Sequence, residues 1–441
     1  MKRFFQTIRN IFSIEDLRVR ILNTIGFLII FRLGSFIVIP GIDPNHPSLT
    51  GAGDTEGILG LLNTFLGGSF SRASIFALGI MPYISASIIV QLLTFAVPYF
   101  QKLQKEGDSG RKRLNQITRV LTIVITAFQS YAYIRGTIDA GAILQPGIFF
   151  YFSAITILVA GTMFCMWLGE RITDKGIGNG ISVLIMIGII SRLPLALYEE
   201  AVYNRGMNGA LLFIIELIVL FAIVMAVIML TQATRRIPIQ YAKQVIGNKL
   251  YGGKRDFIPL KMNSAGVMPI IFAQALMFIP VLLAGLWKDS DAGAYIGSTF
   301  ADPYSWQYNT LFAIMILIFT FFYTAITINA NDIADNLKRN GGFVPGVKPG
   351  KQTAEFIDTV LSRITFPGAL FLALIAILPA FAVLLGVSQN FAQFYGGTSL
   401  LIMVGVILDT LQQIESYLLM RHYEGMMKSG RVKGRSQFAA A

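Results

Sequence analysis

The stretch SRASIFALGIMPYISASIIVQLL, from Ser71 to Leu93, is apolar enough to lie in lipid, but Gly79 and Pro82 interrupt it. A simple membrane anchor would carry only residues such as Leu, Val and Phe at these positions, because Gly and Pro weaken a helix interior. The interruption therefore raises the question of what a break in this span is for.

The rest of the composition is that of an integral membrane protein. Of the 441 residues, 54% are hydrophobic and only 14% are charged, which excludes an ordinary soluble domain. About 20 mostly apolar residues are needed to cross the hydrocarbon layer as a helix, and we find ten such segments. They lie near 21–40, 73–98, 117–136, 148–169, 179–198, 209–231, 264–287, 310–330, 364–387 and 397–416. Because the runs are continuous rather than alternating, they predict helices, and so an all-α polytopic membrane protein.

The interrupted segment has an echo in the second half of the chain. Gly79 to Ile84 reads GIMPYI and Gly266 to Ile271 reads GVMPII, in the second span of each set of five. Because five is odd, the two sets cross the membrane in opposite senses, so a repeat of this kind is an inverted one. The match is short enough to arise by chance, but broken spans at matching positions of two halves point to a central functional site. We expect both helices to bend or loosen at the prolines, near Leu78 and Ala265.

The basic residues predict the orientation. With ten spans, the N-terminal segment, the even-numbered connections and the C-terminal segment at 417–441 hold 30 of the 36 Lys and Arg residues, and the opposite connections hold five. This asymmetry follows the positive-inside rule, so both termini are expected in the cytoplasm. The predicted domains are a cytoplasmic amphipathic segment at 1–20, a first half at 21–200, a second half at 207–420 and a cytoplasmic tail at 421–441.

Two cytoplasmic loops, 232–263 and 331–363, are longer and more basic than orientation alone requires. They are either solvated loops that only set the topology or a docking surface for an acidic partner such as RNA or a protein. The run GGFVPGVKPG at 341–350 favours docking, since so much Gly and Pro makes a shaped turn. The docking candidates are Arg235, Arg236, Lys243, Lys254, Arg255 and Lys348.

Groups that could perform chemistry are sparse within the spans. Cys165, the single cysteine, is interpreted as a small buried apolar residue, and both histidines lie in connections. No catalytic pair and no metal or cofactor site is predicted, and no GxxxxGK[ST] motif indicates an ATP site. Glu216 in the sixth span is as consistent with a protonated or water-facing carboxylate as with a proton relay. Arg32 in the first span either snorkels or meets a partner inside the bundle.

Isoleucines and small polar residues lie near the two breaks. Ile80 and Ile84 are four residues apart on one helical face, as are Ile185 and Ile189 in the fifth span. Such residues normally form only a core, but around a water-filled funnel they would make a constriction that dewets and blocks ions. The polar residues are either packing contacts or part of an interface that can open. They are Ser85, Ser87, Gln91, Asn263, Ser264 and Gln274.

Motifs spread along nearly the whole chain resemble one family. They are FRLGSFIVIPGID at 31–43, SRASIFALGIMPYISASIIVQLL at 71–93, EGDSGRKR at 106–113, GIGNGIS at 176–182, RRIPIQYAK at 235–243, LKMNSAGVMPIIFA at 260–273, GGFVPGVKPG at 341–350 and GGTSLLI at 396–402. In content and order they are similar to the bacterial SecY family, the channel-forming subunits of the general protein-secretion translocon.

The resemblance implies a fold and a set of working parts. The ten helices would form two inverted five-helix halves around a central pore, with a re-entrant plug helix at about 57–71 and a lateral gate between the second and seventh spans. The pore ring implied is Ile80, Ile84, Ile185, Ile189, Ile271 and Ile402. The gate residues implied are Ser85, Gln91 and Asn263.

The resemblance also implies the function and the partners. The chain would be a passive protein-conducting channel in the inner membrane of a bacterium, not an enzyme, and would need no cofactor. SecE-like and SecG-like membrane subunits would accompany it in the lipid bilayer, and a SecA-like motor ATPase or the ribosome would dock on the two loops. Its substrates would be signal peptides and nascent chains.

The sequence departs from the family pattern at two places, and one alternative function also fits part of it. Lys348 stands where the family pattern FVPGIRPG has arginine, which loses the planar fork of a guanidinium, and the first long loop is expanded by NKLYGGKRDF at 248–257. An ion-coupled transporter of a small solute would also have inverted repeats and broken spans. That alternative needs polar or ionisable ligands near the breaks, where this chain carries isoleucines.

Overall fold

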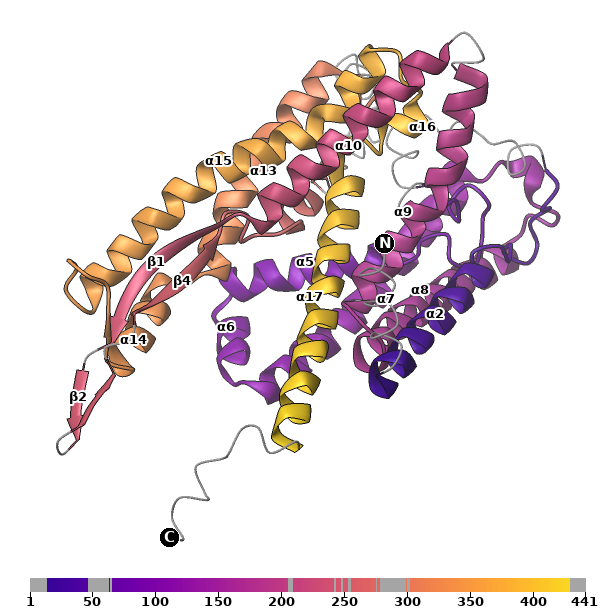
Figure 1. The fold of residues 1–441 in the computed structure, drawn as a ribbon. Coiled ribbons are helices and arrows are strands. Elements are labelled where there is room, and N and C mark those ends of the chain that lie inside the picture. Colours follow the sequence, from indigo (N-terminus) through magenta and orange to yellow (C-terminus); the bar gives the residue numbers. More distant parts are fainter. Residues whose placement is uncertain are drawn as a thin grey trace. The chain divides into compact units, whose positions relative to one another are not determined.

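The computed structural model is mostly helical (Figure 1). It describes residues 14–46, 63, 66–204, 209–241, 243–246, 249–252, 255–274, 276–277, 299 and 302–428. Within these residues seven helices are long and apolar enough to cross a membrane, and the bent pair α5 (Met81–Ala96) and α6 (Pro98–Lys105) makes an eighth if counted as one span.

The chain forms two compact units. The first contains Met1–Thr55, Leu59–Arg192 and Val406–Ala441, and the second consists mainly of Leu193–Gly405. The boundaries between the units fall within α9 (Gly180–Glu199) and within α17 (Gly397–Lys428).

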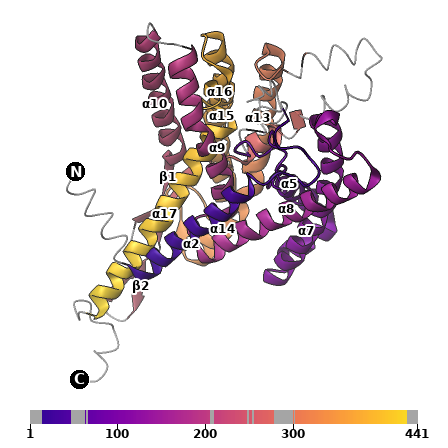
Figure 2. The ribbon, with the colours of Figure 1, turned by 90° about the vertical axis from the view of Figure 1, so that its right-hand side faces the viewer.

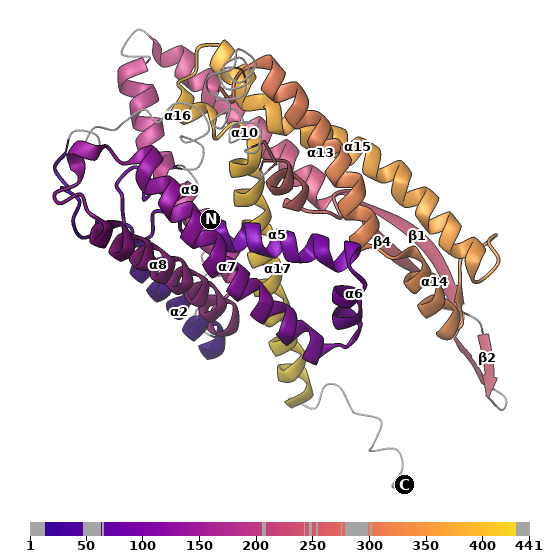
Figure 3. The same ribbon diagram turned by 180° about the vertical axis from the view of Figure 1, so that it is seen from behind.

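In the first unit, α8 (Ile148–Lys175) packs against both α2 (Glu15–Gly34) and α7 (Asp108–Thr137), while α5 packs on α7 (Figure 3). Apolar side chains from four segments meet between them. The buried members of this cluster are Phe31, Phe76, Ile80, Cys165, Leu168, Ile172 and Leu184. Cys165 is therefore a buried core residue, as expected from its neighbours in the sequence.

In the second unit, α13 (Trp306–Thr327) lies beside α15 (Lys351–Leu384), and α10 (Ala210–Gln232) leads into the sheet (Figure 2). A helix of 34 residues, such as α15, is about 50 Å long at 1.5 Å per residue. This exceeds the roughly 30 Å of a hydrocarbon core, so α15 extends beyond the membrane at its polar first turns. Further short helices are α14 (Ala330–Arg339), α16 (Gln389–Ala392) and η2 (Glu200–Asn204).

The two long basic loops, 232–263 and 331–363, are joined in one small sheet, which was not predicted from the sequence. Strands β4 (Arg255–Lys261), β1 (Thr234–Tyr241) and β5 (Gly342–Phe343) lie in that order and pair antiparallel, while β2 (Lys243–Ile246) and β3 (Lys249–Gly252) form a separate hairpin. One face of the larger sheet is covered by α14 and the first turns of α15 (Figure 1). The residues buried there are Ile237, Ile239, Leu260, Leu337, Val344, Ile357 and Leu361.

The second predicted span, 73–98, is wrong at its beginning. Helix α5 begins only at Met81, and the residues before it, from Leu66 to Ile80, form successive turns. Composition alone cannot separate an apolar helix from an apolar turn segment buried in a bundle. The chain then bends by 99° between α5 and α6, at the residue before Pro98, because the residue before a proline disfavours the α-helical conformation.

The first predicted span differs from its helix in extent, and the seventh is described only in part. The first predicted span, 21–40, corresponds to α2, which begins at Glu15 and ends at Gly34. The seventh span is helical at 268–274, and its predicted continuation through 278–287 lies outside the described residues, as do residues 1–13 of the N-terminal segment and 429–441 of the tail.

Candidate functional site

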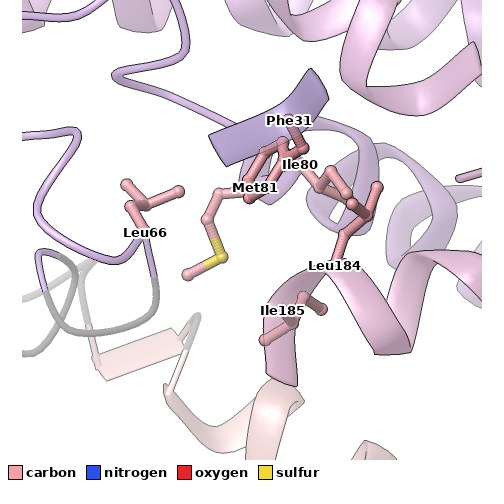
Figure 4. Close-up of a pocket in the computed structure, with 6 residues that line it drawn as sticks. All are labelled: Phe31, Leu66, Ile80, Met81, Leu184 and Ile185. Atoms are coloured by element: carbon pink, nitrogen blue, oxygen red, sulfur yellow. The ribbon is translucent and has the colours of Figure 1, made fainter. Parts of the chain in front are cut away.

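A small apolar hollow in the first unit lies at the start of α5 (Figure 4). It is small and partly open to solvent, with about 10 Å³ of room for the centre of a water-sized sphere, and six apolar side chains line it. Ile80 and Met81 come from the beginning of α5, Leu184 and Ile185 come from α9, Phe31 comes from α2, and Leu66 comes from the turn segment. The hollow offers no polar or charged group to a small ligand, so it is suited to excluding water and ions.

The beginning of α5 explains the Gly and Pro in the opening stretch. Pro82 occupies the first turn of α5, where its missing N–H costs no helical hydrogen bond. Gly79 has a φ of +50°, and a Cβ atom built on it would lie 2.5 Å from Cδ2 of Leu66. The break therefore starts a helix rather than kinking one, and the missing side chain of Gly79 makes room for Leu66.

The echo in the second unit has the same local structure. Gly266 has a φ of +64°, and the helical residues begin at Met268 with Pro269 in the first turn. We expected the chain to bend or loosen near Leu78 and Ala265, and both residues indeed lie outside a helix. Neither proline bends a continuous helix, because each lies in the first turn of one. The two sites differ in their surroundings, since a Cβ atom on Gly266 would meet no described residue within 4 Å.

The turn segment before α5 is attached to the end of α2 and to α7. The backbone N–H of Ile75 donates to the carbonyl of Ile37 at 2.9 Å, and that of Ile39 donates to the carbonyl of Ala73 at 2.9 Å. The rings of Phe70 and Tyr133 pack with their centroids 4.7 Å apart. These contacts hold the residues that lead from the predicted plug into α5. Of the predicted plug at 57–71, only Asn63 and residues 66–71 belong to the described residues.

The four predicted ring isoleucines of the first unit differ in burial and in whether they line the hollow. Ile80 is buried and Ile185 is half-buried, and both line the hollow. Ile84 lies one turn after Ile80, where its N–H donates to the carbonyl of Ile80 at 3.1 Å, and it packs on the same core cluster. Ile189 is fully buried. In the second unit Ile402 is buried and Ile271 is half-buried.

The three predicted gate residues differ in how their polar groups are satisfied. The hydroxyl of Ser85 donates to the carbonyl of Met81 at 3.2 Å, and the amide of Gln91 donates to Ser87 at 3.5 Å, so both bond within α5. Asn263 in the second unit is 7% exposed, and neither its amide nitrogen nor its oxygen has a hydrogen-bond partner among the described residues. Leaving a buried amide unpaired costs about 1–3 kcal/mol.

Three of the six predicted docking residues, Arg235, Arg236 and Arg255, lie on the three-stranded sheet of the second unit. Along β1 the inward residues are Ile237 and Ile239, so Arg236 points to the opposite, exposed face. Gln240 pairs with Arg255 on that same face, which places a second arginine there. Arg235 and Lys348 are also exposed. Lys243 begins β2, and Lys254 lies outside the described residues.

Comparison with known proteins decides the family. A model of the SecY family matches residues 74–411. The chain belongs to the SecY family. A relative from Streptomyces scabiei named "Protein translocase subunit SecY" is 43% identical over 433 residues, covering 95% of this chain and 98% of the relative. The protein of the same name from Escherichia coli K12 is 42% identical and covers 96% of each chain.

Solved structures of channels share the fold of this chain. "The structure of a protein conducting channel" aligns with a TM-score of 0.61 at 17% identity, over 90% of this chain and 92% of that one. "Sec61 in the Canine ribosome-channel complex from the endoplasmic reticulum" aligns with a TM-score of 0.58 at 16% identity over the same shares. The all-α membrane fold predicted from the sequence is therefore confirmed.

Two side-chain contacts with the backbone were not predicted from the sequence of this SecY-family chain. No role was predicted for Arg72, which lies just before the predicted second span. Its guanidinium donates to the carbonyls of Gly67 and Gly68. The double glycine was a usable signal, because consecutive glycines favour left-handed backbone. Glu200 was also missed. It is fully buried, and its carboxylate accepts from the N–H of Ser388 at 3.0 Å. Within the described residues no group of His, Cys, Asp and Glu could hold a metal ion.

Proposed function

We propose that this chain is the central subunit of a protein-conducting channel. Unfolded secretory polypeptides would cross the membrane through it, and transmembrane segments would leave it sideways into lipid. The observation that carries the proposal is the apolar hollow where Ile80 and Ile185 meet Leu66, in a chain of the SecY family. The names of the relatives and the fold shared with solved protein-conducting channels support it.

In the proposed mechanism, a ring of apolar side chains closes the pore by excluding water, without binding a ligand. Ile80, Ile84, Ile185 and Ile189 of the first unit would be joined by Ile271 and Ile402 of the second in a ring. Branched apolar side chains around a narrow passage make water leave it, and ions cannot pass without their hydration. An extended polypeptide brings its own surface into contact with the ring, so the same side chains can seal around it.

The plug would complete the seal in the absence of a polypeptide. Leu66, which belongs to the predicted plug, lines the hollow and lies beside Gly79 at the start of α5. An entering polypeptide would displace the plug and take the place of Leu66. The turn segment that follows is attached to α2 and α7, which would keep the plug tethered as it moves.

The lateral gate would run along α5 in the first unit and the segment around Asn263 in the second. Ser85 and Gln91 satisfy their polar groups within α5, so they would exchange partners at little cost. The unpaired amide of Asn263 makes its present position less stable than that of an apolar residue. An energetic penalty of this kind lowers the free-energy difference between a closed and an open gate.

The channel is not an enzyme, and a partner must supply the driving energy. The exposed basic face of the sheet, with Arg236 and Arg255, would dock the ribosome or a SecA-like motor ATPase, and Lys348 on the second loop would contribute. SecE-like and SecG-like subunits would complete the complex. Both termini would lie in the cytoplasm of a bacterium, with the channel in its inner membrane, as the distribution of basic residues favours.

Reconstitution tests this function. The chain is placed in vesicles with its membrane partners, and a secretory precursor is added with the motor and ATP. Protease-protected precursor inside the vesicles is the expected result. No protected product with a motor that hydrolyses ATP would contradict the proposal, and saturable uptake of a small solute instead would favour an ion-coupled transporter.

A further inference from the structure

Two consecutive glycines in the described part of the predicted plug have an unusual backbone conformation. Gly67 has a φ of +61° and Gly68 a φ of +86°, a region that side chains disfavour. The carbonyl of Gly67 accepts from Nη1 of Arg32 at 3.0 Å and from Nη2 of Arg72 at 2.9 Å. The carbonyl of Gly68 accepts from Nε of Arg72 at 3.0 Å. Two arginines from different segments thus hold two adjacent peptide groups.

The arginines are themselves held in place. The guanidinium groups of Arg32 and Arg72 lie 5.1 Å and 4.3 Å from the ring centroid of Phe36, so one aromatic ring orients both cations. Arg192 of α9 also lies here, since a Cβ atom on Gly68 would be 2.8 Å from its Nη2. All three arginines are half-buried.

The glycines are required for this arrangement. A Cβ atom on Gly67 would lie 2.7 Å from Nη1 of Arg32 and 3.1 Å from the backbone of Gly188. A Cβ atom on Gly68 would lie 2.6 Å from Nη2 of Arg72. Any other residue at either position would therefore push a guanidinium away from its carbonyl.

We infer that Arg32 and Arg72 are positioning residues that latch the carboxyl-terminal end of the plug in its closed position, through the carbonyls of Gly67 and Gly68. This inference rests on the proposed channel function. The latch suits a reversible seal, because charged donors bind backbone carbonyls strongly, yet both partners are polar groups that can bind water when they part.

The test compares Arg72→Gln and Arg32→Gln with Arg135→Gln in the complete reconstituted complex. Arg135 is a matched control, because its guanidinium stacks on Tyr131 and Tyr151 and makes none of the plug contacts. One readout is small-ion leakage through the idle channel, and the other is motor-driven translocation of a precursor. We expect leakage to rise about tenfold or more in the two latch variants. Each lost hydrogen bond to a charged donor should raise the ratio of displaced to closed plug by about that factor. Arg135→Gln should leak as the parent does.

Two further variants separate a latch from general damage. Gly68→Ala keeps every arginine but displaces Arg72, so it should leak like Arg72→Gln. Arg72→Lys keeps one donor and should leak less than Arg72→Gln. Latch variants that translocate precursor but remain as tight as the parent would overturn the latch and leave the channel function standing. A parent complex that moves no precursor would instead count against the proposed function itself.

Discussion

Gly79→Ala is the substitution whose effect follows most directly from the geometry. The new Cβ atom would lie 2.5 Å from Cδ2 of Leu66, in a residue with a φ of +50°. The left-handed backbone alone costs a residue with a side chain about 1–2 kcal/mol. The contact adds a separate cost, which is relieved when Leu66 leaves the hollow. The variant should therefore favour a displaced plug and an incompletely sealed channel.

The chain supplies a control that isolates this contact. Gly266→Ala introduces the same left-handed strain at φ +64°, but its Cβ atom would meet none of the residues that the structure describes within 4 Å. The difference between the two variants should be the contact with Leu66, about 1–2 kcal/mol, or roughly a 5- to 30-fold change in the population of open channels. Gly136→Ala, at a helical position with open space, should behave as the parent does.

The assay is ion conductance of the idle complex in a planar bilayer, with folding checked by thermal unfolding in detergent. Gly79→Ala should conduct more than Gly266→Ala in the absence of precursor. A Leu66→Ala change made in each background completes a double-mutant cycle, and its two effects should be non-additive because the two side chains touch. Equal leakage from Gly79→Ala and Gly266→Ala, or strictly additive effects in the cycle, would refute this account of the glycine.

Three other changes test the remaining parts. Ile80→Asn should leak ions and accept precursors with weak signal sequences, because a polar side chain wets the constriction; unchanged conductance and unchanged precursor selection would count against the ring. Asn263→Leu should raise the free energy of unfolding by about 1–3 kcal/mol, because the buried amide has no partner among the described residues. It should also slow the translocation of precursors with weak signal sequences. A lower melting temperature would show that the amide is satisfied. Lys348→Arg should tighten motor binding a few-fold through a bidentate contact, whereas Arg236→Ala should weaken it; binding unaffected by either would move the docking surface elsewhere.

The membrane fold was predictable because apolar runs of sufficient length have few other outcomes in a chain this poor in charge. Helices α9 and α10 match their predicted spans within one residue, whereas α8 continues past its predicted end at 169 and α7 begins at Asp108, before its predicted start at 117. The beginning of α5 was not predictable from hydropathy, since the turn segment before it is buried and as apolar as a helix. The order Gly79, Met81, Pro82 held the correct signal, because proline is tolerated in the first helical turn and glycine just before it permits left-handed backbone.

The site was predicted less completely than the fold. Motif resemblance named Ile80 and Ile185, and both line the hollow. Leu66 and Phe31, which complete it, come from segments far apart in the chain, so no local pattern could bring them together. The sheet was missed although β1 alternates, with Ile237 and Ile239 facing inward, because the run is short and carries Pro238. Arg72 was missed because its partners are backbone carbonyls, which no sequence pattern displays.

The most direct test of the central claim is a photo-crosslink from within the proposed constriction. A photoreactive amino acid is placed at Ile80, a precursor is arrested halfway through the reconstituted channel, and the sample is illuminated. The control position is Phe128 on α7, which is 77% exposed on the outside of the first unit. A crosslink to the arrested precursor from position 80 and none from position 128 is the predicted result. Precursor that reaches the vesicle interior without crosslinking to position 80 would contradict the account.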